Sequence, residues 1–422
     1  MDSPDGLIER RILDVAIERM ADEPVILLEG PRSVGKSTAL QAIARRLNGE
    51  IIDLDDIATR DVVLADPATM VGGHGLVCID EYQRAPLVLD AIKAELNRSS
   101  RPGRFVLTGS ARHESLPTTA QALTGRLHRL TVYPLAQTEI AGVPAGLLSG
   151  LFGAPASTIA GDASTTTRED YTNRIVRGGF PLALTRASAA SRHRWFDDYV
   201  RLTLERDVRE LSRVRQARAL PSVLERLAGQ TAQILNISSV AERTGLDVNT
   251  ARDYIRLLQA VFLVQLLPAW GKTLTSRSAS TPKVHVLDSG VAARLLRLTP
   301  EKLARRDATA LTEFGHLLKT FVVGELLKEA SWLDGINGAG HWRTYDGAEV
   351  DLVVERDDGA VVAFEVKAAA RASAEDFRAL KQLRDTVGDA FVAGVVLYTG
   401  VRGYTYDDRL HVLPVDRLWT AR

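Results

Sequence analysis

A glycine-rich loop near the start of the chain carries the residues most suited to chemistry. Residues 30–37 fit the pattern Gly-x-x-x-x-Gly-Lys-Ser/Thr of a phosphate-binding loop, between an apolar run and a helical pattern. Backbone amides of such a loop surround phosphates, Lys36 can neutralise the β- and γ-phosphates, and the Ser37 hydroxyl can ligate Mg²⁺. A glycine turn before an ordinary helix is the alternative. The expected nucleotide-binding residues are Gly30, Pro31, Arg32, Ser33, Val34, Gly35, Lys36, Ser37 and Thr38.

Acidic and hydroxyl residues follow the next two apolar runs of the same region. The first run leads into Asp80 and Glu81, and we expect Asp80 to hold Mg²⁺ through water while Glu81 polarises the attacking water. An acidic pair also solvates many strand ends, so this assignment depends on the phosphate loop. The second run ends in Thr-Gly-Ser, where either Thr108 or Ser110 would contact the γ-phosphate or the water.

Arg126 is a candidate for stabilising negative charge in the transition state, because it follows a glycine just before another apolar run. It would act within its own chain or from a neighbouring copy. An ordinary surface arginine is an equally good interpretation. The sequence contains no Asn-Lys-x-Asp motif for reading guanine, which favours ATP over GTP. The expected reaction is therefore Mg²⁺-dependent hydrolysis of ATP.

Carboxylates and a lysine also gather in the C-terminal part of the sequence. Two strand-like runs between residues 349 and 367 flank Asp-Asp-Gly, which is typical of a β-hairpin. With a three-residue loop, Asp351 faces Glu365 and Glu349 faces Lys367, all on one face of the sheet. The two central carboxylates would then be close enough to share a divalent metal. Charges that merely solvate the sheet are the alternative. The opposite, apolar face would comprise Val350, Leu352, Phe364 and Val366.

The composition is that of a globular protein large enough for several domains. The 422 residues are 45% hydrophobic and 25% charged, which argues against collagen-like, low-complexity and wholly disordered chains. Fifty-three Lys and Arg balance 53 Asp and Glu, so nucleic-acid contact would need a local basic patch. Cys78 is the single cysteine, and the sequence has neither a positively charged leader nor a run of 18 apolar residues. We expect a cytoplasmic protein that does not contact membranes.

Four segments must position these residues. Residues 1–143 alternate short apolar runs with helical periodicity, which predicts an α/β domain with a parallel sheet buried on both faces. Residues 144–167 are rich in Gly, Ala, Ser and Thr and are expected to form a flexible loop or insertion. Residues 168–310 are mostly helical by pattern, and residues 205–207 are expected to form solvated or interdomain ion pairs. Residues 311–422 begin with a long amphipathic helix followed by strand-like runs, which predicts a second α/β domain.

The third segment contains a possible DNA-binding element. A helix, a glycine turn, a second helix and an apolar run follow one another between residues 240 and 267. This order predicts a winged-helix module, whose second helix would enter a DNA major groove. Arg252 and Arg256 would lie on one face of that helix, and Lys272 and Arg277 in a basic wing. A spacer that contacts only protein is an equally good interpretation.

Seven short motifs carry a family resemblance. They are Gly30-Pro31-Arg32, Ile79-Asp80-Glu81, Leu107-Thr108-Gly109-Ser110, Gly125-Arg126, Tyr133-Pro134-Leu135, Gly178-Gly179-Phe180-Pro181 and Lys283-Val284-His285-Val286-Leu287-Asp288-Ser289-Gly290. Together they resemble the bacterial and archaeal AAA-superfamily ATP-binding proteins with a C-terminal domain of unknown function. The resemblance covers nearly the whole chain except about 144–166, and Ser33 stands where glutamine is frequent. It implies an AAA-type P-loop ATPase domain followed by winged-helix and nuclease-like parts.

The C-terminal carboxylates and lysine resemble the core of PD-(D/E)XK nucleases. This resemblance implies that Asp351 and Glu365 bind Mg²⁺, that Lys367 positions or activates water, and that Glu325 on the preceding helix completes the acidic set. Such hard carboxylate ligands suit Mg²⁺ or Mn²⁺.

Two functions follow as expectations. The first is a Mg²⁺-dependent AAA-type ATPase whose ATP state positions a DNA-binding half, with or without nuclease activity. The second is an ATP-driven switch or scaffold for a protein partner, in which the nuclease-like fold does not cut. ATP and Mg²⁺ are the expected cofactors, and DNA, another protein or a second copy of the chain is the expected partner.

Overall fold

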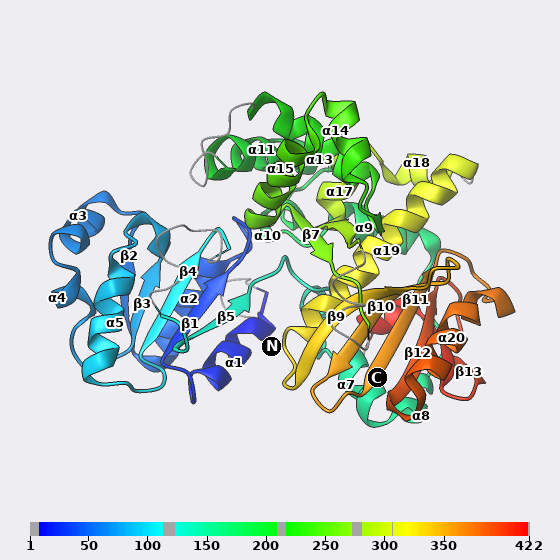
Figure 1. Cartoon of the computed structure of the whole chain (residues 1–422), viewed down its shortest axis with the longest axis horizontal. Helices are drawn as coiled ribbons and strands as arrows, with labels where there is room; N and C mark the ends of the chain where they lie inside the picture. The colour runs from blue at the N-terminus through cyan, green and yellow to red at the C-terminus, as the bar shows by residue number, and fades with distance from the viewer. Residues whose placement is uncertain (1–7, 113–122, 209–216, 272–280, 306, 421–422) are drawn as a thin grey trace.

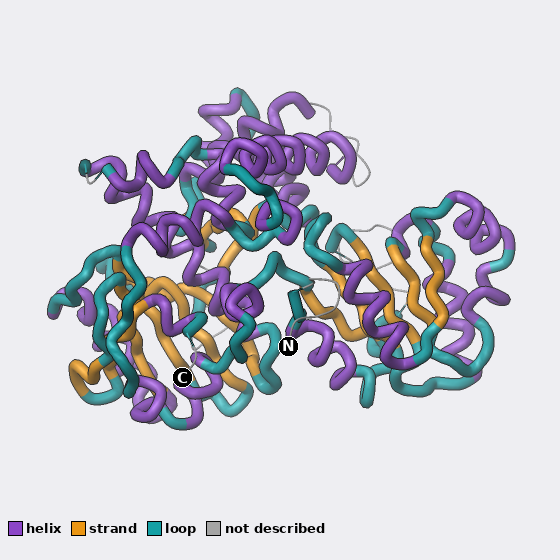
Figure 2. Tube along the Cα trace, turned by 180° about the vertical axis from the view of Figure 1, so that it is seen from behind, coloured by secondary structure: helices purple, strands orange, loops and turns teal. Residues whose placement is uncertain are grey.

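The computed structural model describes residues 8–112, 123–208, 217–271, 281–305 and 307–420. The N-terminal α/β domain lies to one side, and the rest of the chain forms a helical region next to a second α/β domain (Figure 1). Figure 2 shows from behind that the two large sheets belong to separate domains. Within the described ranges, no helix is long and apolar enough to cross a membrane.

The N-terminal domain is built on a five-stranded sheet in the order β2-β3-β4-β1-β5, and every pair of neighbours is parallel. This confirms the predicted parallel sheet. The strands are β1 (Val25–Glu29), β2 (Glu50–Asp53), β3 (Val77–Asp80), β4 (Phe105–Gly109) and β5 (Leu127–Thr131). The helical elements are α1 (Arg11–Arg19), α2 (Lys36–Leu47), α3 (Ile57–Ala65), α4 (Pro67–Val71), the 3-10 turn η1 (Tyr82–Arg84) and α5 (Val88–Arg98).

Helices cover both faces of this sheet, which explains why its strands read as continuous apolar runs. Ile26 and Leu28 of β1 share one core with α1 and α2, whereas Val25 and Leu27 share another with α5. All five residues of β1 are buried. Such two-sided burial is the normal environment of parallel strands.

The middle region is mostly helical and carries a small antiparallel sheet in the order β6-β8-β7. The predicted order of helix, glycine turn, helix and strand is present, with Gly245 between the two helices at a φ of 68°. The winged-helix assignment itself remains a prediction. The elements are α9 (Arg168–Arg177), α10 (Pro181–Leu184), α11 (Ala189–Leu202), the π-helical turn η3 (Thr203–Asp207), η4 (Ala217–Ala219), α13 (Leu220–Gly229), β6 (Gln233–Ile234), α14 (Ile237–Thr244), α15 (Val248–Ala260), β7 (Val264–Leu267), β8 (Lys283–Val286), α17 (Ser289–Leu295) and α18 (Pro300–Ala304).

The C-terminal domain has a mixed six-stranded sheet in the order β13-β14-β12-β11-β10-β9. The long helix α19 and the helix α20 contribute to different apolar cores of this sheet. The elements are α19 (Ala308–Ala330), β9 (Ile336–Arg343), β10 (Glu349–Arg356), β11 (Val361–Lys367), η5 (Ala374–Phe377), α20 (Arg378–Val387), η6 (Gly388–Ala390), β12 (Phe391–Tyr398), β13 (Tyr404–Asp407), β14 (Leu410–Pro414) and η7 (Val415–Leu418).

The predicted hairpin of β10 and β11 is present with the predicted register. Leu352 pairs with Phe364, and Gly359 adopts a φ of 82° in the connecting turn. The predicted apolar face is only partly correct, because the pairing of β10 with β9 shifts register between Val350 and Val353. Val350 therefore packs in the core that contains α20, whereas Leu352 packs in the core that contains α19.

Residues 144–167, expected to form a flexible loop or insertion, are only partly a loop, because residues 147–153 and 155–159 are helical. They contain α7 (Leu147–Gly153), which packs against β11 and β12, and α8 (Pro155–Ile159), which packs against β14. Another short helix, α6 (Gln137–Ala141), precedes them. Leu147, Leu148 and Leu151 are buried. Their helical spacing was the available signal, and the many small residues around them concealed it.

Candidate functional site

The phosphate loop connects β1 to α2 at the carboxyl end of the parallel sheet. Ser33 and Gly35 have positive φ angles of 62° and 94°. Gly30 is required because a Cβ atom there would lie 2.3 Å from the carbonyl oxygen of Val132. The loop ends at the N-terminus of α2, where free amides and the helix dipole favour a phosphate group.

Lys36 is buried within this loop. Its ammonium group donates to the carbonyl oxygens of Gly30, at 3.0 Å, and Pro31, at 2.8 Å. Burial lowers the pKa of Lys36 to about 8. The ammonium group has neutral partners in these two bonds, so it can exchange them for the charged oxygens of a phosphate.

A hydrogen bond between Asp80, at the end of β3, and Thr108, near the end of β4, connects these two strands beside the phosphate loop. The Thr108 hydroxyl donates to Asp80 and accepts from the Glu81 amide at 3.0 Å. The Ser37 side chain also forms a hydrogen bond with Asp80. Burial raises the pKa of Asp80 despite these bonds. Ser37 and Asp80, the two residues expected to hold Mg²⁺, therefore lie together.

Glu81 is held by two neutral donors. The Ser110 hydroxyl donates to Glu81 Oε2 at 3.1 Å, and the Gln83 amide donates to the same carboxylate and to Ser110 Oγ, the latter at 3.0 Å. Thr108 and Ser110, between which the sequence could not choose, both belong to the site and have different partners. Sequence analysis missed Gln83, although its position two residues after Glu81 was a signal.

Arg32 connects the phosphate loop to the middle region. Its Nε atom lies 2.6 Å from Asp207 Oδ1, and its Nη1 atom lies 4.0 Å from Glu81 Oε1. Asp207 ends η3 and is buried. The interdomain ion pair expected for residues 205–207 is therefore confirmed at Asp207.

Two further arginines join the phosphate loop and the loop after β4 to other parts of the chain. Arg10 donates to the carbonyl oxygens of Val34, at 2.5 Å, and Tyr133, at 2.7 Å, and its Nε lies 3.1 Å from Glu139 of α6. Arg112, after β4, donates through its backbone and side chain to the last turn of α15. Neither arginine was identified from the sequence, because their partners are distant in the chain.

Arg126 does not lie at the phosphate loop of its own chain. It immediately precedes β5, whose first residue pairs with Val25 at the start of β1, so it lies at the opposite edge of the sheet. Its guanidinium group donates to Asn97 at 2.7 Å. The prediction that Arg126 acts within its own chain is wrong, and a role from a neighbouring copy remains a prediction.

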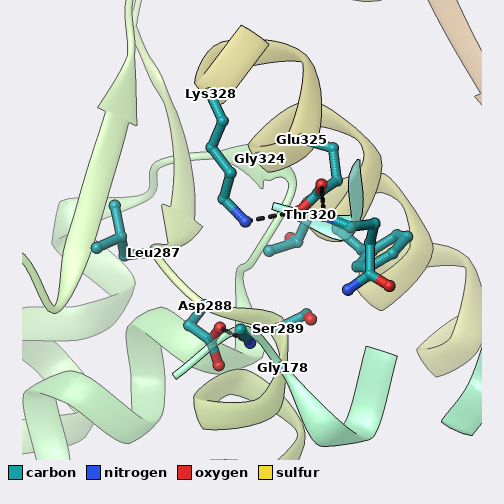
Figure 3. A pocket seen from close by; sticks show the side chains of 11 residues that line it. Gly178, Leu287, Asp288, Ser289, Thr320, Gly324, Glu325 and Lys328 are labelled. Carbon is teal, nitrogen blue, oxygen red and sulfur yellow. Dashed lines mark hydrogen bonds and ion pairs between the residues drawn. The ribbon is translucent and has the colours of Figure 1, made fainter. Parts of the chain in front are cut away.

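Glu325, expected in the acidic set of the C-terminal domain, lies at a different junction. Its carboxylate accepts from the Gln137 amide and from the Lys328 ammonium group, both at 2.6 Å (Figure 3). Lys328 also donates to the Leu135 carbonyl at 3.1 Å. Glu325 and Lys328 of α19 thus bind the segment that follows the N-terminal domain and hold it against this helix. The assignment of Glu325 to a metal site with Asp351 and Glu365 is wrong, because its carboxylate lies at this junction and, among the described residues, no three such side chains are arranged to hold a metal ion.

The motifs at residues 178–181 and 283–290 meet at the same junction. Asp288 accepts from the amides of Gly290 and Val291 at the start of α17, at 2.9 and 3.0 Å, and from the Gly179 amide at 2.7 Å. The cavity beside Asp288 (Figure 3) has a volume of about 10 Å³, which is room for about one water molecule. These motifs therefore hold the junction together. A larger cavity of about 360 Å³ adjoins it and is lined in part by Gln137, Arg174 and Gly178.

The C-terminal carboxylates lie in a buried cluster with lysines. Asp351 contacts Lys283 at 2.9 Å and Lys319 at 2.8 Å, whereas Glu365 contacts Lys367 at 3.1 Å and Lys319 at 3.7 Å. The expected facing of Glu349 and Lys367 is replaced by separate pairs, Glu349 with Lys283 at 2.6 Å and Lys367 with Asp376 at 3.3 Å.

Opposite pKa shifts distinguish the two central carboxylates. Burial alone would raise the pKa of Asp351, but the ammonium groups of Lys283 and Lys319 hold it well below its usual range. Burial and the charge of Asp351 raise the pKa of Glu365 to about 7. Asp351 is therefore ionised at neutral pH, whereas Glu365 gains or loses its proton near neutral pH.

The candidate DNA-contacting residues have local partners. Arg252 and Arg256 are exposed on α15, where Arg252 donates to Asn249 at 2.9 Å and Arg256 pairs with Asp253 at 3.3 Å. Lys272 and Arg277 lie outside the described residues. The nucleic-acid interface remains a prediction.

Three family models match separate parts of the chain. Residues 22–141 match a family model described as an AAA domain. Residues 168–302 and 314–418 match two domains of unknown function, DUF8612 and DUF4143. Residues 22–141 thus form an AAA-type P-loop domain, as the sequence predicted, followed by two domains of undefined function.

Proteins that are similar over most of this chain do not assign a function. Uncharacterized proteins of Mycobacterium tuberculosis and Mycobacterium bovis are each 27% identical over 420 residues, which is 98% of this chain and 86% of each relative. A Walker-type ATPase of Pyrococcus abyssi is 14% identical, with 70% of this chain and 98% of that chain covered and a TM-score of 0.42. AMPPCP-bound DnaA of Aquifex aeolicus is 14% identical, with 61% and 92% covered and a TM-score of 0.30.

Proposed function

We propose that this chain hydrolyses ATP with Mg²⁺ and uses the nucleotide state to act on its middle region as a switch. The observation that carries the proposal is the meeting of three loops at one sheet edge. The phosphate loop, the Asp80-Glu81 end of β3 and the hydroxyl-bearing end of β4 are joined by hydrogen bonds through Ser37, Thr108 and Ser110.

Each residue at this edge has a separate role in phosphoryl transfer. Lys36 exchanges its two carbonyl partners for phosphate oxygens, and Ser37 and Asp80 would hold Mg²⁺. Mg²⁺ neutralises phosphate charge when it is bound. Glu81 orients and polarises the attacking water, while Ser110 and Gln83 fix the position of its carboxylate.

Hydrolysis and binding are tested separately in two variants. We expect Lys36→Ala to lose binding of a fluorescent ATP analogue, because the phosphate charge has no lysine partner. Glu81→Gln should keep binding and release phosphate about 10² to 10⁴ times more slowly. Lys93→Ala, at an exposed lysine of α5, is the matched control. Wild-type turnover in Glu81→Gln would contradict the proposal.

Two contacts support transmission to the middle region. Arg32 joins the phosphate loop to Asp207, and Arg112 joins the loop after β4 to the end of α15. A γ-phosphate lies between such loops in a P-loop site, so its presence or loss changes the environment of both arginines.

Hydrogen exchange tests this transmission. The amides of residues 203–207 should differ in protection with and without ATP in Glu81→Gln, which holds ATP uncleaved. Asp207→Asn should abolish that difference while leaving ATP binding intact. Equal protection with and without ATP would contradict the switch and leave only the proposal of ATP hydrolysis.

DNA binding by α15 is the second candidate function, supported by the exposure of Arg252 and Arg256. Phosphate contacts release counterions, so binding should weaken steeply with salt. Fluorescence anisotropy of duplex DNA at 50 and 200 mM salt would measure it (about a tenfold loss for two contacts). The double variant Arg252→Ala/Arg256→Ala should lose this binding and Lys93→Ala should retain it.

A further inference from the structure

The buried ionic cluster of the C-terminal domain consists of Lys283, Lys319, Glu349, Asp351 and Glu365. Its members come from four elements: β8 of the middle region and α19, β10 and β11 of the C-terminal domain. Lys283 is 1% exposed and Asp351 is 2% exposed. The cluster occupies the position where the nuclease resemblance places a divalent metal.

The Asp351 carboxylate has no oxygen left for a metal. Its Oδ1 atom accepts from Lys283 and Lys319, each at 2.9 Å. Its Oδ2 atom accepts from the Val366 amide at 3.0 Å and lies 2.8 Å from the Lys319 ammonium group. A carboxylate offers about four lone-pair positions, and four donor contacts fill them.

Lys319 also stands between the two carboxylates that would share the ion. Its ammonium group is 2.8 Å from Asp351 and 3.7 Å from Glu365, so a bridging cation would have to lie beside another positive charge. Glu365 Oε2 is the one oxygen of this pair without a hydrogen-bond partner in the described part of the chain. Mg²⁺ is usually held by one or two carboxylates and several waters, so this single oxygen, next to the Lys319 ammonium group, does not replace the carboxylate pair that the nuclease resemblance assigns to the metal.

The rest of the expected metal-binding set does not compensate. Glu325 is committed to Gln137 and Lys328 at the other junction. Among the described residues, no group of three or more His, Cys, Asp or Glu side chains is arranged to hold a metal ion. The residues present therefore do not fit a Mg²⁺ site.

The cluster instead joins two sheets. Lys283 of β8 reaches from the sheet of the middle region to Glu349 and Asp351 of β10. Nearby, the Trp270 amide donates to the His341 carbonyl of β9 at 2.6 Å. A buried charge that loses its partner is strongly destabilising, so these ion pairs fix the two sheets to each other.

We infer that lysines take the place of a metal in this domain, so that its carboxylates lock the middle sheet to the C-terminal sheet and do not support metal-dependent cleavage. The C-terminal domain is then a scaffold that moves with the middle region. This inference does not depend on ATP hydrolysis, because none of its residues lies in the nucleotide site.

Manganese uptake tests the metal part of the inference. Mn²⁺ is titrated into the nucleotide-free full chain and followed by loss of its free EPR signal. An Asp80→Asn background removes the candidate metal ligand of the nucleotide site. We expect the same uptake, or none, with Asp351 intact and with Asp351→Asn. One Mn²⁺ per chain that disappears in Asp351→Asn would overturn the inference. Melting of the Asp80→Asn chain in 10 mM Mg²⁺ and in EDTA answers the same question without Asp351→Asn. A higher melting temperature in Mg²⁺ would also overturn the inference.

Thermal unfolding tests the lock itself. Lys283→Met should lower the melting temperature by about 10 °C, because Glu349 loses its ammonium partner and Asp351 loses one of two. Lys93→Met, at an exposed lysine, is the matched control. Equal melting temperatures in the two variants would contradict the lock.

Discussion

The nucleotide site and the C-terminal ionic cluster use the same residue types in opposite ways. Around Asp80 and Glu81, the donors are mostly neutral hydroxyl and amide groups, and Lys36 is bound to carbonyl oxygens. Around Asp351, two ammonium groups act as donors. Neutral donors position a carboxylate and leave its charge available to a cation, whereas ammonium groups cancel that charge. An Asp, a Glu and a Lys near strand ends are therefore insufficient to define a metal site, and the charge of the groups that hold the acids decides.

Removing one negative charge from each region should give the largest contrast. We expect Asp351→Asn to lower the free energy of unfolding by about 3 to 5 kcal/mol, because Lys283 and Lys319 lose their shared partner. Asp80→Asn should change it by less than about 1 kcal/mol, because burial already disfavours the charge there. Urea unfolding measures both, and similar losses in the two variants would break the comparison.

The pH dependence of stability should report the charge of Glu365. Folding raises the pKa of Glu365 from 4.5 to about 7, so the folded chain binds more protons than the unfolded chain between these values. The associated stability is present below pH 4.5 and is lost as the pH rises to about 7, by about 3 kcal/mol at most. The free energy of unfolding, measured at pH 5 and pH 8, should show this loss in the wild type. Glu50→Gln, at an exposed position, should show the same loss, and Glu365→Gln should show a smaller one.

The affinity for ATP should report the charge of Lys36. Its pKa is lowered to about 8 by burial, and phosphate requires the charged form. Above pH 8, binding must therefore take up a proton, so the Kd for ATP should rise by up to about tenfold per pH unit. Titrations of the wild type with a non-hydrolysable ATP analogue between pH 7 and 9.5 measure this without hydrolysis and keep the charge of Glu81, which raises the pKa of Lys36. A Kd that stays constant over that range would show that Lys36 remains charged in the empty loop.

The smallest expected effect concerns the link between the N-terminal domain and the middle region. Arg32 and Asp207 are about as accessible as Lys319 and Asp351, but the Lys319 ammonium group contacts both Asp351 oxygens, at 2.9 and 2.8 Å. A double-mutant cycle with Arg32→Ala and Asp207→Ala should give a coupling energy of about 1 kcal/mol. The corresponding cycle for Lys319 and Asp351 should give a coupling energy several times larger. A larger coupling energy for Arg32 and Asp207 than for Lys319 and Asp351 would contradict this expectation.

Local sequence predicted the parts of the molecule that depend on short stretches of chain. The phosphate loop, the acidic end of β3 and the β10–β11 register follow from residues close in sequence. The lysines of the ionic cluster do not, because Lys283 and Lys319 lie 68 and 32 positions before Asp351. Charge neutralisation there depends on the packing of β8 and α19 on the hairpin. Sequence spacing could not show that packing.

The same limit explains the errors at Glu325 and Arg126. A helical acid upstream of a hairpin suits the nuclease pattern, but the three-residue spacing from Glu325 to Lys328 forms a buried ion pair that faces the connector. Arg126 was a candidate for the nucleotide site, but it precedes its strand, so a parallel sheet places it at the far edge. Direction along a strand, more than distance in sequence, decided which residues meet.

The position of α7 has a consequence for synthesis on the ribosome. This helix follows the N-terminal domain in the chain, yet its apolar side packs on β11 and β12, which begin about 200 residues later. At about 5 to 20 residues per second, Leu147, Leu148 and Leu151 wait roughly 10 to 50 s for their packing partners. During this interval the nascent chain presents an apolar helix beside an already complete N-terminal domain. Chaperone binding during translation should therefore be concentrated on residues 147–159.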